Sequence, residues 1–279
     1  MELQVINPYD NSLVERLETS TEPKVKECIA NAIAAGAEFA RMPACQRGEI
    51  LNRAADLIKQ NAEELSQLIV RESGKPMRYA SGEVKRCIET FTFAADVARS
   101  LHGETIPMDA AKNGVGKQGF YIRVPVGLVA AITPFNFPLN LVAHKVAPAL
   151  ACGCSIVLKP APATPLTALK LAELLKEAGL PEHVFGIVLG EADVGKWLTR
   201  DERVNMISFT GSAPVAKAHQ SRGRTASHHV RIGWQCCCGD RRECYHKRCT
   251  DQSLGGGGIC LQRSGVHQRA APLYSQERL

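Results

Sequence analysis

The first part of the chain carries hydrophobic residues at the spacing of amphipathic helices. Apolar positions recur every three or four residues, which places them on one face of a helix. A Gly-Lys-Pro turn then interrupts the pattern, and a polar, glycine-rich stretch follows a third helical segment. The pattern predicts helices over 24–41, 46–73 and 81–101, a loop over 103–117 and a short strand at 121–124.

Beyond residue 126 the pattern changes to short, continuous apolar runs, which are typical of strands buried on both faces. Each run is followed by a helical pattern, so strands and helices alternate. This alternation predicts an α/β fold, a parallel sheet with helices on both faces, preceded by the N-terminal helices. Functional loops then belong at the carboxyl ends of the strands. The predicted strands are 127–133, 155–158, 184–189 and 205–209, and the predicted helices are 138–151, 164–178 and 193–198.

After residue 215 this regularity is lost. Residues 216–279 are rich in Arg, His, Cys and Gly and carry a net charge of +7, from 11 basic and 4 acidic residues. Residues 1–215 carry −1, from 23 basic and 24 acidic residues, so no basic patch suggests nucleic-acid binding. We therefore divide the chain into a domain over 1–215 and an aberrant tail over 216–279, which is expected to be disordered.

The first 215 residues also bear on location. Their five scattered cysteines favour reduced thiols and a cytoplasmic protein. The N-terminus lacks the basic stretch and apolar run of a secretion signal. The longest apolar stretches contain Pro, Asn, His and Lys and fall short of a membrane span, so no membrane partner is expected.

Three predicted strand ends carry residues suited to chemistry. Asn136 lies between Pro134 and Pro138, which restrict the backbone, so its amide is placed to donate a hydrogen bond to a developing oxyanion. The alternative is a turn residue that caps the next helix. Lys159 suits a ribose hydroxyl or a phosphate, or is a solvated lysine. Ser212 suits a pyrophosphate at a helix N-terminus, or is a simple N-cap.

Two glycines, Gly190 and Gly195, follow the third predicted strand. Their spacing resembles that of a dinucleotide-binding loop, but only weakly. Four longer segments are more specific. In their order and spacing, they resemble the aldehyde dehydrogenase superfamily over roughly residues 3–218. The segments are Val-Pro-Val-Gly at 124–127, Pro-Phe-Asn-Phe-Pro at 134–138, Lys-Pro-Ala-Pro-Ala-Thr-Pro at 159–165 and Phe-Thr-Gly-Ser at 209–212.

The resemblance implies a domain that binds NAD or NADP on its parallel sheet. Asn136 would then be the side-chain donor of the oxyanion hole, Lys159 would bind the adenosine ribose, and Gly211–Ser212 would hold the pyrophosphate. Many NAD-preferring members carry Glu three residues after this lysine, where this chain has Pro162. Losing that carboxylate removes repulsion against a 2′-phosphate, so both cofactors stay open. The groove would also include Ile132, Thr133, Pro134, Phe135, Gly190, Gly195 and Phe209.

In this family a cysteine thiolate attacks an aldehyde, hydride passes to the nicotinamide, and a glutamate activates the water that releases the acid. The motifs that supply these residues, Glu-Leu-Gly-Gly and Gly-Gln-x-Cys, do not occur in this sequence. The resemblance therefore implies an aldehyde dehydrogenase, homo-oligomeric at full length, whose present chain is inactive. The alternative is a non-catalytic dinucleotide-binding or subunit-interaction fragment.

Read one base over, a permitted back-translation of the tail contains both motifs. Residues 231–241 can be back-translated so that the next frame encodes Glu-Leu-Gly-Gly-Asn-Ala-Ala-Val-Val-Ile. In the same frame, residues 259–267 permit Phe-Ala-Tyr-Ser-Gly-Gln-Val-Cys. We therefore hypothesise a single uncorrected frameshift between Val215 and Gln220, which leaves the tail out of frame.

The tail allows three rival interpretations. Its clustered Cys and His residues suggest zinc, but three consecutive cysteines fit no ordinary zinc-ligand spacing, so no metal site is predicted. A lone cysteine could act as a nucleophile, yet no motif surrounds it. Consecutive glycines could cradle a phosphate, but they favour flexibility. The residues concerned are Cys236–Cys238, Cys244, His246 and Cys249 for zinc, Cys260 for the nucleophile, and Gly255–Gly258 for phosphate.

Overall fold

The structure, a computed structural model, describes residues 2–212, 229–233 and 266–270. It opens with an antiparallel hairpin that the hydrophobic pattern did not predict, because Leu3 and Val5 are its buried residues and the other positions are exposed or half-buried. Helices follow. These N-terminal elements are β1 (Glu2–Ile6), β2 (Leu13–Glu18), α1 (Glu22–Phe39), α2 (Ala44–Gln60), α3 (Ala62–Ser73) and α4 (Met77–Ser100).

The single helix predicted over 46–73 is wrong, since α2 and α3 are separate. The backbone leaves the helical geometry at Asn61, whose side-chain amide donates to the carbonyl of Leu57 at 2.8 Å. The apolar spacing continues across this break, so periodicity alone could not reveal it. The predicted end of α3 is confirmed, because Gly74 follows it with a left-handed φ of 66°.

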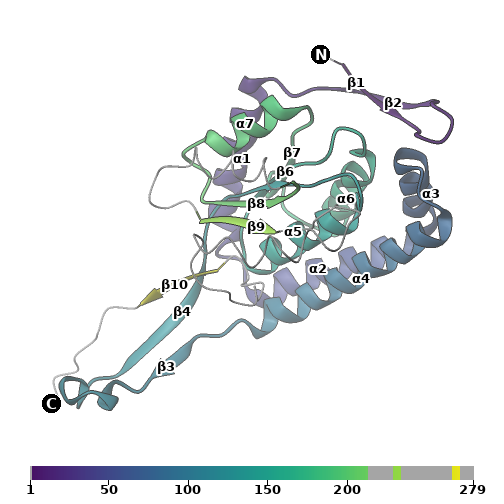
Figure 1. The fold of residues 1–279 in the computed structure, drawn as a ribbon. Helices are drawn as coiled ribbons and strands as arrows, with labels where there is room; N and C mark the ends of the chain where they lie inside the picture. Colours follow the sequence, from purple (N-terminus) through teal and green to yellow (C-terminus); the bar gives the residue numbers. More distant parts are fainter. Residues whose placement is uncertain (1, 213–228, 234–265, 271–279) are drawn as a thin grey trace, which may run out of the picture.

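The predicted loop over 103–117 also contains regular structure. A short strand, β3 (Glu104–Ile106), pairs with β4 (Gly119–Pro125), and two 3₁₀ turns lie between them. The hydrogen bonds of β3 come from β4, a partner that a local pattern of polar residues cannot reveal. Together β3 and β4 form an arm that projects from the body of the molecule (Figure 1).

After these elements, the chain forms a five-stranded parallel sheet with the strand order β7-β6-β5-β8-β9, which confirms the predicted fold class. In this part of the chain, each helix connects one strand of the sheet to the next strand along the chain, as the alternating pattern indicated. The elements are β5 (Val129–Ile132), α5 (Asn140–Ala151), β6 (Ile156–Lys159), α6 (Leu166–Glu177), β7 (Phe185–Ile187), α7 (Ala192–Arg200), β8 (Met206–Thr210) and β9 (His229–Gly233).

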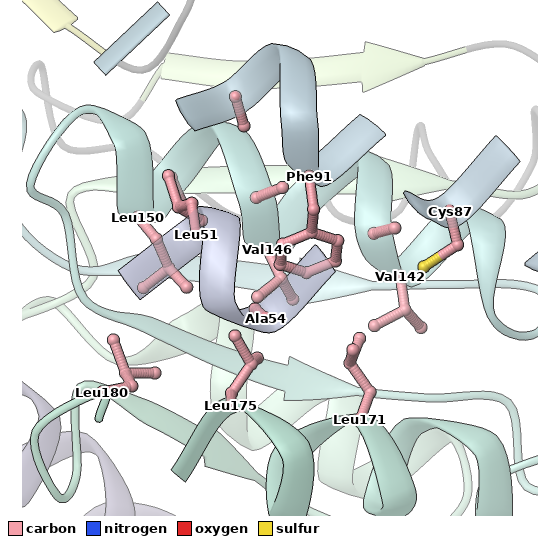
Figure 2. Close-up of a cluster of buried hydrophobic side chains, with 14 of the residues drawn as sticks. Leu51, Ala54, Cys87, Phe91, Val142, Val146, Leu150, Leu171, Leu175 and Leu180 are labelled. Carbon is pink, nitrogen blue, oxygen red and sulfur yellow. The ribbon is translucent and has the colours of Figure 1, made fainter. Parts of the chain in front are cut away.

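Helices cover both faces of the sheet. On one face, α1 and α7 pack over a cluster that includes Ile132 and Phe209. On the other, α5 and α6 lie on the sheet, and α2 to α4 pack behind them (Figure 1). Figure 2 shows the core of this second layer, where Phe91 of α4 lies close to side chains of α2 and α5, and side chains of α6 belong to the same cluster. The N-terminal helices are therefore part of the same core as the sheet.

Two short segments of the predicted tail form strands. β9 extends the parallel sheet beside β8, and β10 (Val266–Ala270) pairs antiparallel with β4. The other residues of 216–279 lie outside the described residues, so the division at residue 215 stays a prediction. The residues proposed for zinc, for a nucleophile and for a phosphate cradle all lie outside as well.

Two further findings concern the described part of the chain. None of its helices combines the length and the hydrophobicity needed to cross a membrane. Its five cysteines, which are Cys28, Cys45, Cys87, Cys152 and Cys154, are free thiols.

Candidate active site

Three of the predicted site segments follow adjacent strands. In the register of the sheet, Ile132 at the end of β5 pairs with Lys159 on one side and with Phe209 on the other. The strands are parallel, so the segments that leave them emerge at one edge of the sheet. This edge carries the loop with Asn136, the end of β6 and the segment that reaches Ser212. The sheet thus gathers these segments, while their roles stay predictions.

Lys159 is buried at this edge, with 6% of its surface exposed, so the alternative of a solvated lysine is wrong. Its ammonium donates to the carbonyl of Pro160 at 3.2 Å. Burial lowers the pKa of Lys159, and the nearby charge of Glu191 opposes that shift. A Cβ at Gly195 would lie 3.5 Å from Cδ of Lys159, so α7 covers the lysine directly.

Two of the three candidate glycines, Gly190 and Gly211, allow close packing at the same edge. Gly190 has a φ of 142°, and a Cβ there would lie 2.6 Å from the side chain of Val194. A Cβ at Gly211 would lie 2.5 Å from the ring of Phe209. These glycines therefore have packing reasons to be present, whatever their contact with a cofactor.

The loop after β5 leads from the sheet into α5. Thr133 is buried and donates its backbone N–H to the carbonyl of Lys159 at 3.3 Å, while Phe135 is 64% exposed. Asn136 is half-buried, and Pro162, in the neighbouring loop, is half-buried as well. The N-cap position of α5 is Leu139, so the alternative in which Asn136 caps this helix is wrong.

A fully buried glutamate from α4 holds this loop in place. One carboxylate oxygen of Glu83 accepts the backbone N–H groups of Leu139 and Asn140, both at 3.0 Å. The other oxygen pairs with Lys75, whose ammonium also donates to the carbonyl of Asn136 at 2.9 Å. Glu83 therefore serves as the missing cap of α5 and fixes the backbone of the predicted oxyanion donor.

A second buried glutamate does the same for α6. Glu72 of α3 accepts the backbone N–H groups of Leu166 at 2.7 Å and Thr167 at 3.3 Å, and the hydroxyl of Thr167 at 2.6 Å. Burial raises the pKa of Glu72 to about 7, although these hydrogen bonds oppose the shift. One signal for both contacts is present in the sequence: neither Leu139 nor Pro165, at the two N-cap positions, has a capping side chain.

Lys145 is a third buried charged residue, and the hydrophobic pattern of the sequence did not predict its burial. It lies on α5, is 8% exposed, and donates to the hydroxyls of Thr210 at 2.8 Å and Ser208 at 3.1 Å. Burial lowers its pKa to about 8. The contact ties α5 to the end of β8, next to Gly211.

A cavity of about 760 Å³ lies between α4 and α5, next to the loop that carries Asn136. Lys75 links the two, because it lines the cavity and also bonds the carbonyl of Asn136. Among the described residues, no group of three or more His, Cys, Asp or Glu side chains is placed to hold a metal ion. The cavity is lined by Lys75, Arg78, Tyr79, Gly82, Arg86, Phe137, Asn140, Leu141 and His144.

The sequence matches the aldehyde dehydrogenase family over residues 1–232. It is 41% identical over 221 residues to a 3-sulfolactaldehyde dehydrogenase of Priestia aryabhattai, covering 79% of this chain and 46% of that protein. It is 42% identical over 209 residues to aspartate-semialdehyde dehydrogenase 1 of Pseudomonas canavaninivorans, covering 75% of this chain and 44% of that protein. The chain thus spans about half the length of these relatives.

Solved structures share the same fold. The crystal structure of a glyceraldehyde-3-phosphate dehydrogenase from Methanocaldococcus jannaschii, complexed with NADP, superposes with a TM-score of 0.77 and 36% identity. The superposition covers 83% of this chain and 50% of that one.

Proposed function

Because the chain belongs to the aldehyde dehydrogenase family, we propose that it carries the cofactor half of an enzyme that oxidises an aldehyde to a carboxylate with NAD or NADP. One observation supports this most directly. The segments with Asn136, Lys159 and Ser212 leave three adjacent parallel strands at the same edge of the sheet. That edge is where open α/β sheets bind their ligands.

Lys159 fits a dinucleotide. In the described part of the chain its ammonium has a single hydrogen-bond acceptor, the carbonyl of Pro160, and no ion pair, so it keeps donors for ribose hydroxyls. NAD or NADP, when bound, accepts the hydride of the reaction. The Methanocaldococcus jannaschii structure contains NADP, and in our chain Pro162 places no carboxylate against a 2′-phosphate. We therefore propose either NAD or NADP as the cofactor.

Asn136 fits an oxyanion donor because its backbone is fixed. Its carbonyl is held by Lys75, which Glu83 in turn holds, so little reorganisation is needed when charge develops on the substrate oxygen. The family's thiolate and water-activating glutamate have no matching motif in this sequence. We therefore expect the chain itself to show no turnover.

We attribute that deficit to a frameshift between Val215 and Gln220. Sequencing the DNA across codons 210–225 tests it, and a neighbouring frame without the two family motifs would refute it. The alternative is a non-catalytic dinucleotide-binding or subunit-interaction fragment, which the missing motifs favour. We further expect a cytoplasmic location, supported by the free thiols, and a homo-oligomer, supported by apolar side chains on β4.

Calorimetric titration with NAD and NADP tests the cofactor proposal on the chain as it exists. We expect saturable binding of at least one of them, and Lys159→Met to weaken it about tenfold through the loss of charge-assisted hydrogen bonds. Lys196→Met, on the exposed side of α7, is the matched control and should leave the affinity unchanged. A folded chain that binds neither dinucleotide would contradict the proposal.

The aldehyde itself is not fixed by the relatives. The names of the two relatives and of the solved structure contain 3-sulfolactaldehyde, aspartate semialdehyde and glyceraldehyde 3-phosphate, which differ in size and shape. All three are aldehydes with an acidic group elsewhere in the molecule.

A further inference from the structure

The first turn of α7 lies over Lys159. A Cβ at Gly195 would be 3.5 Å from Cδ and 3.9 Å from Cε of the lysine. Glu191, at the N-cap position of α7, accepts the backbone N–H of Gly195 on its carbonyl at 3.5 Å, so the two residues lie one helical turn apart. Residues at this spacing lie on the same side of a helix. Glu191 is therefore on the side of α7 that faces the end of β6.

The charge of Glu191 acts on Lys159. Burial lowers the pKa of Lys159, and Glu191 is the charged group that opposes this shift. Within the described residues, the two side chains form no ion pair with each other, and the exposed carboxylate of Glu191 has no hydrogen-bond partner. Asp193, on the same turn, is instead paired with Lys196 at 2.7 Å. Glu191 thus places a negative charge near Lys159 that no neighbouring cation on this turn offsets.

An ammonium and a carboxylate near each other suit the adenosine ribose of NAD. The adjacent 2′- and 3′-hydroxyls of this ribose both donate and accept hydrogen bonds. Lys159 can donate to them, and the carboxylate of Glu191 can accept from them. NADP carries a 2′-phosphate in place of one hydroxyl. That phosphate offers the carboxylate no donor, and the two negative charges repel each other.

We propose that Glu191 makes the chain select NAD over NADP, by taking the role that the resemblance assigns to a glutamate three residues after the lysine. Pro162 stands at that position, so the loop after β6 supplies no carboxylate there. The start of α7 supplies one instead. The inference rests on the proposed function, since it assigns the adenosine ribose to Lys159, and it decides between the two cofactors that the proposed function leaves open.

Calorimetric titration of the full chain with NAD and with NADP tests the inference. We expect the wild-type chain to bind NAD at least about tenfold more tightly than NADP. Glu191→Gln keeps the shape of the side chain and removes its charge. It should reduce this preference about tenfold, mainly by tightening the binding of NADP, because the repulsion of the 2′-phosphate is lost.

Glu202→Gln is the matched control, because Glu202 is an exposed residue beyond the other end of α7 and its loss changes the net charge equally. It should leave the preference unchanged. The double variant Glu191→Gln with Pro162→Glu is a second test. It returns a carboxylate to the position that the resemblance indicates, so it should regain the preference for NAD. Thermal unfolding of each variant establishes that it is folded.

The pattern of affinities separates this inference from the proposed function. A wild-type chain that binds NADP as tightly as NAD, or more tightly, would overturn the inference and leave the proposed function intact. The inference would also be wrong if Glu191→Gln kept the full preference for NAD, or if Glu202→Gln lost as much of it. A folded chain that binds neither dinucleotide would contradict the proposed function itself, and the inference with it.

Discussion

Glu83 connects α4, the start of α5 and the loop of the predicted oxyanion donor through one buried carboxylate. Glu83→Gln should lower the free energy of unfolding by about 3 kcal/mol, because it leaves the largely buried ammonium of Lys75 without its counter-charge. Equilibrium unfolding in urea measures the loss.

The double variant Glu83→Gln with Lys75→Met provides the control. It removes the stranded charge, so it should be more stable than the sum of the two single changes predicts. Additive losses, or a loss below about 1 kcal/mol in Glu83→Gln, would mean that the pair does not hold the loop as we infer.

Glu72 predicts a dependence of stability on pH. Burial raises its folded-state pKa from the ordinary value of 4.5 to about 7, so the folded protein binds a proton that the unfolded chain releases between these values. This stabilisation is complete below about pH 4.5 and is lost as the pH rises through about 7. Relative to Glu72→Gln, wild type should lose about 3 kcal/mol across this window.

Urea unfolding at pH 5 and pH 8 measures the difference. Glu63→Gln, at an exposed position of the same helix, is the matched control and should follow the pH profile of wild type. A profile of Glu72→Gln that runs parallel to wild type would show that Glu72 stays ionised throughout.

At the residue level, the sequence identified candidate site residues whose neighbours along the chain are unusual. It did not identify the buried charged residues whose neighbours along the chain are ordinary. Asn136 between two prolines and Lys159 at the end of an apolar run stand out, and the structure places both at the same edge of the sheet. Glu72 and Glu83 look like the solvated charges that any amphipathic helix carries. Only tertiary packing buries them against helices distant in sequence.

At the level of elements, two helical glycines should respond oppositely to the same substitution. Gly82→Ala should stabilise the protein by about 0.5–1 kcal/mol, because the methyl group enters open space and alanine favours the helix. Gly36→Ala in α1 should destabilise it by about 1–3 kcal/mol, because its Cβ would lie 2.5 Å from the hydroxyl of buried Ser155.

Thermal unfolding of the two variants gives the sign of each change. Because helix propensity is the same in both, their contrast isolates the packing of α1 against the start of β6. Two stabilising changes would mean that α1 can shift away from the sheet at little cost.

The elements that the sequence predicted best are those whose own pattern decides their structure. The buried strands and the helices between them follow from continuous and periodic apolar runs, with bounds that shift by a few residues. The elements it missed depend on remote partners. β1 and β3 pair with other strands of mixed polarity, and the break at Asn61 is hidden by apolar residues on either side.

At the level of the whole molecule, buried charged side chains connect the N-terminal helices to α5 and α6, and α5 to the sheet, near the candidate site. Glu72 and Glu83 extend from the N-terminal helices to the first turns of α6 and α5, and Lys145 extends from α5 to β8. The first N–H groups of both helices are therefore already hydrogen-bonded to glutamate side chains. The role predicted for Gly211–Ser212, which lie at the same edge of the sheet, stays a prediction.

The arm formed by β3 and β4 gives the last prediction. Phe120 and Ile122 are 52% and 51% exposed, and they lie on the same face of β4, two residues apart. Exposed apolar side chains grouped on a projecting strand are typical of an interface. Sedimentation velocity should therefore detect self-association of the chain at micromolar concentration. Phe120→Lys with Ile122→Lys should abolish it, because burying two ammonium groups in an apolar contact is costly.

Val115→Lys is the matched control for the arm. Val115 is 71% exposed and lies in the connection between β3 and β4, outside β4 itself, so the added charge should leave the association intact. A wild-type chain that sediments as a monomer would remove the interface altogether. An equal loss in Val115→Lys would indicate repulsion from net charge rather than contact through Phe120 and Ile122.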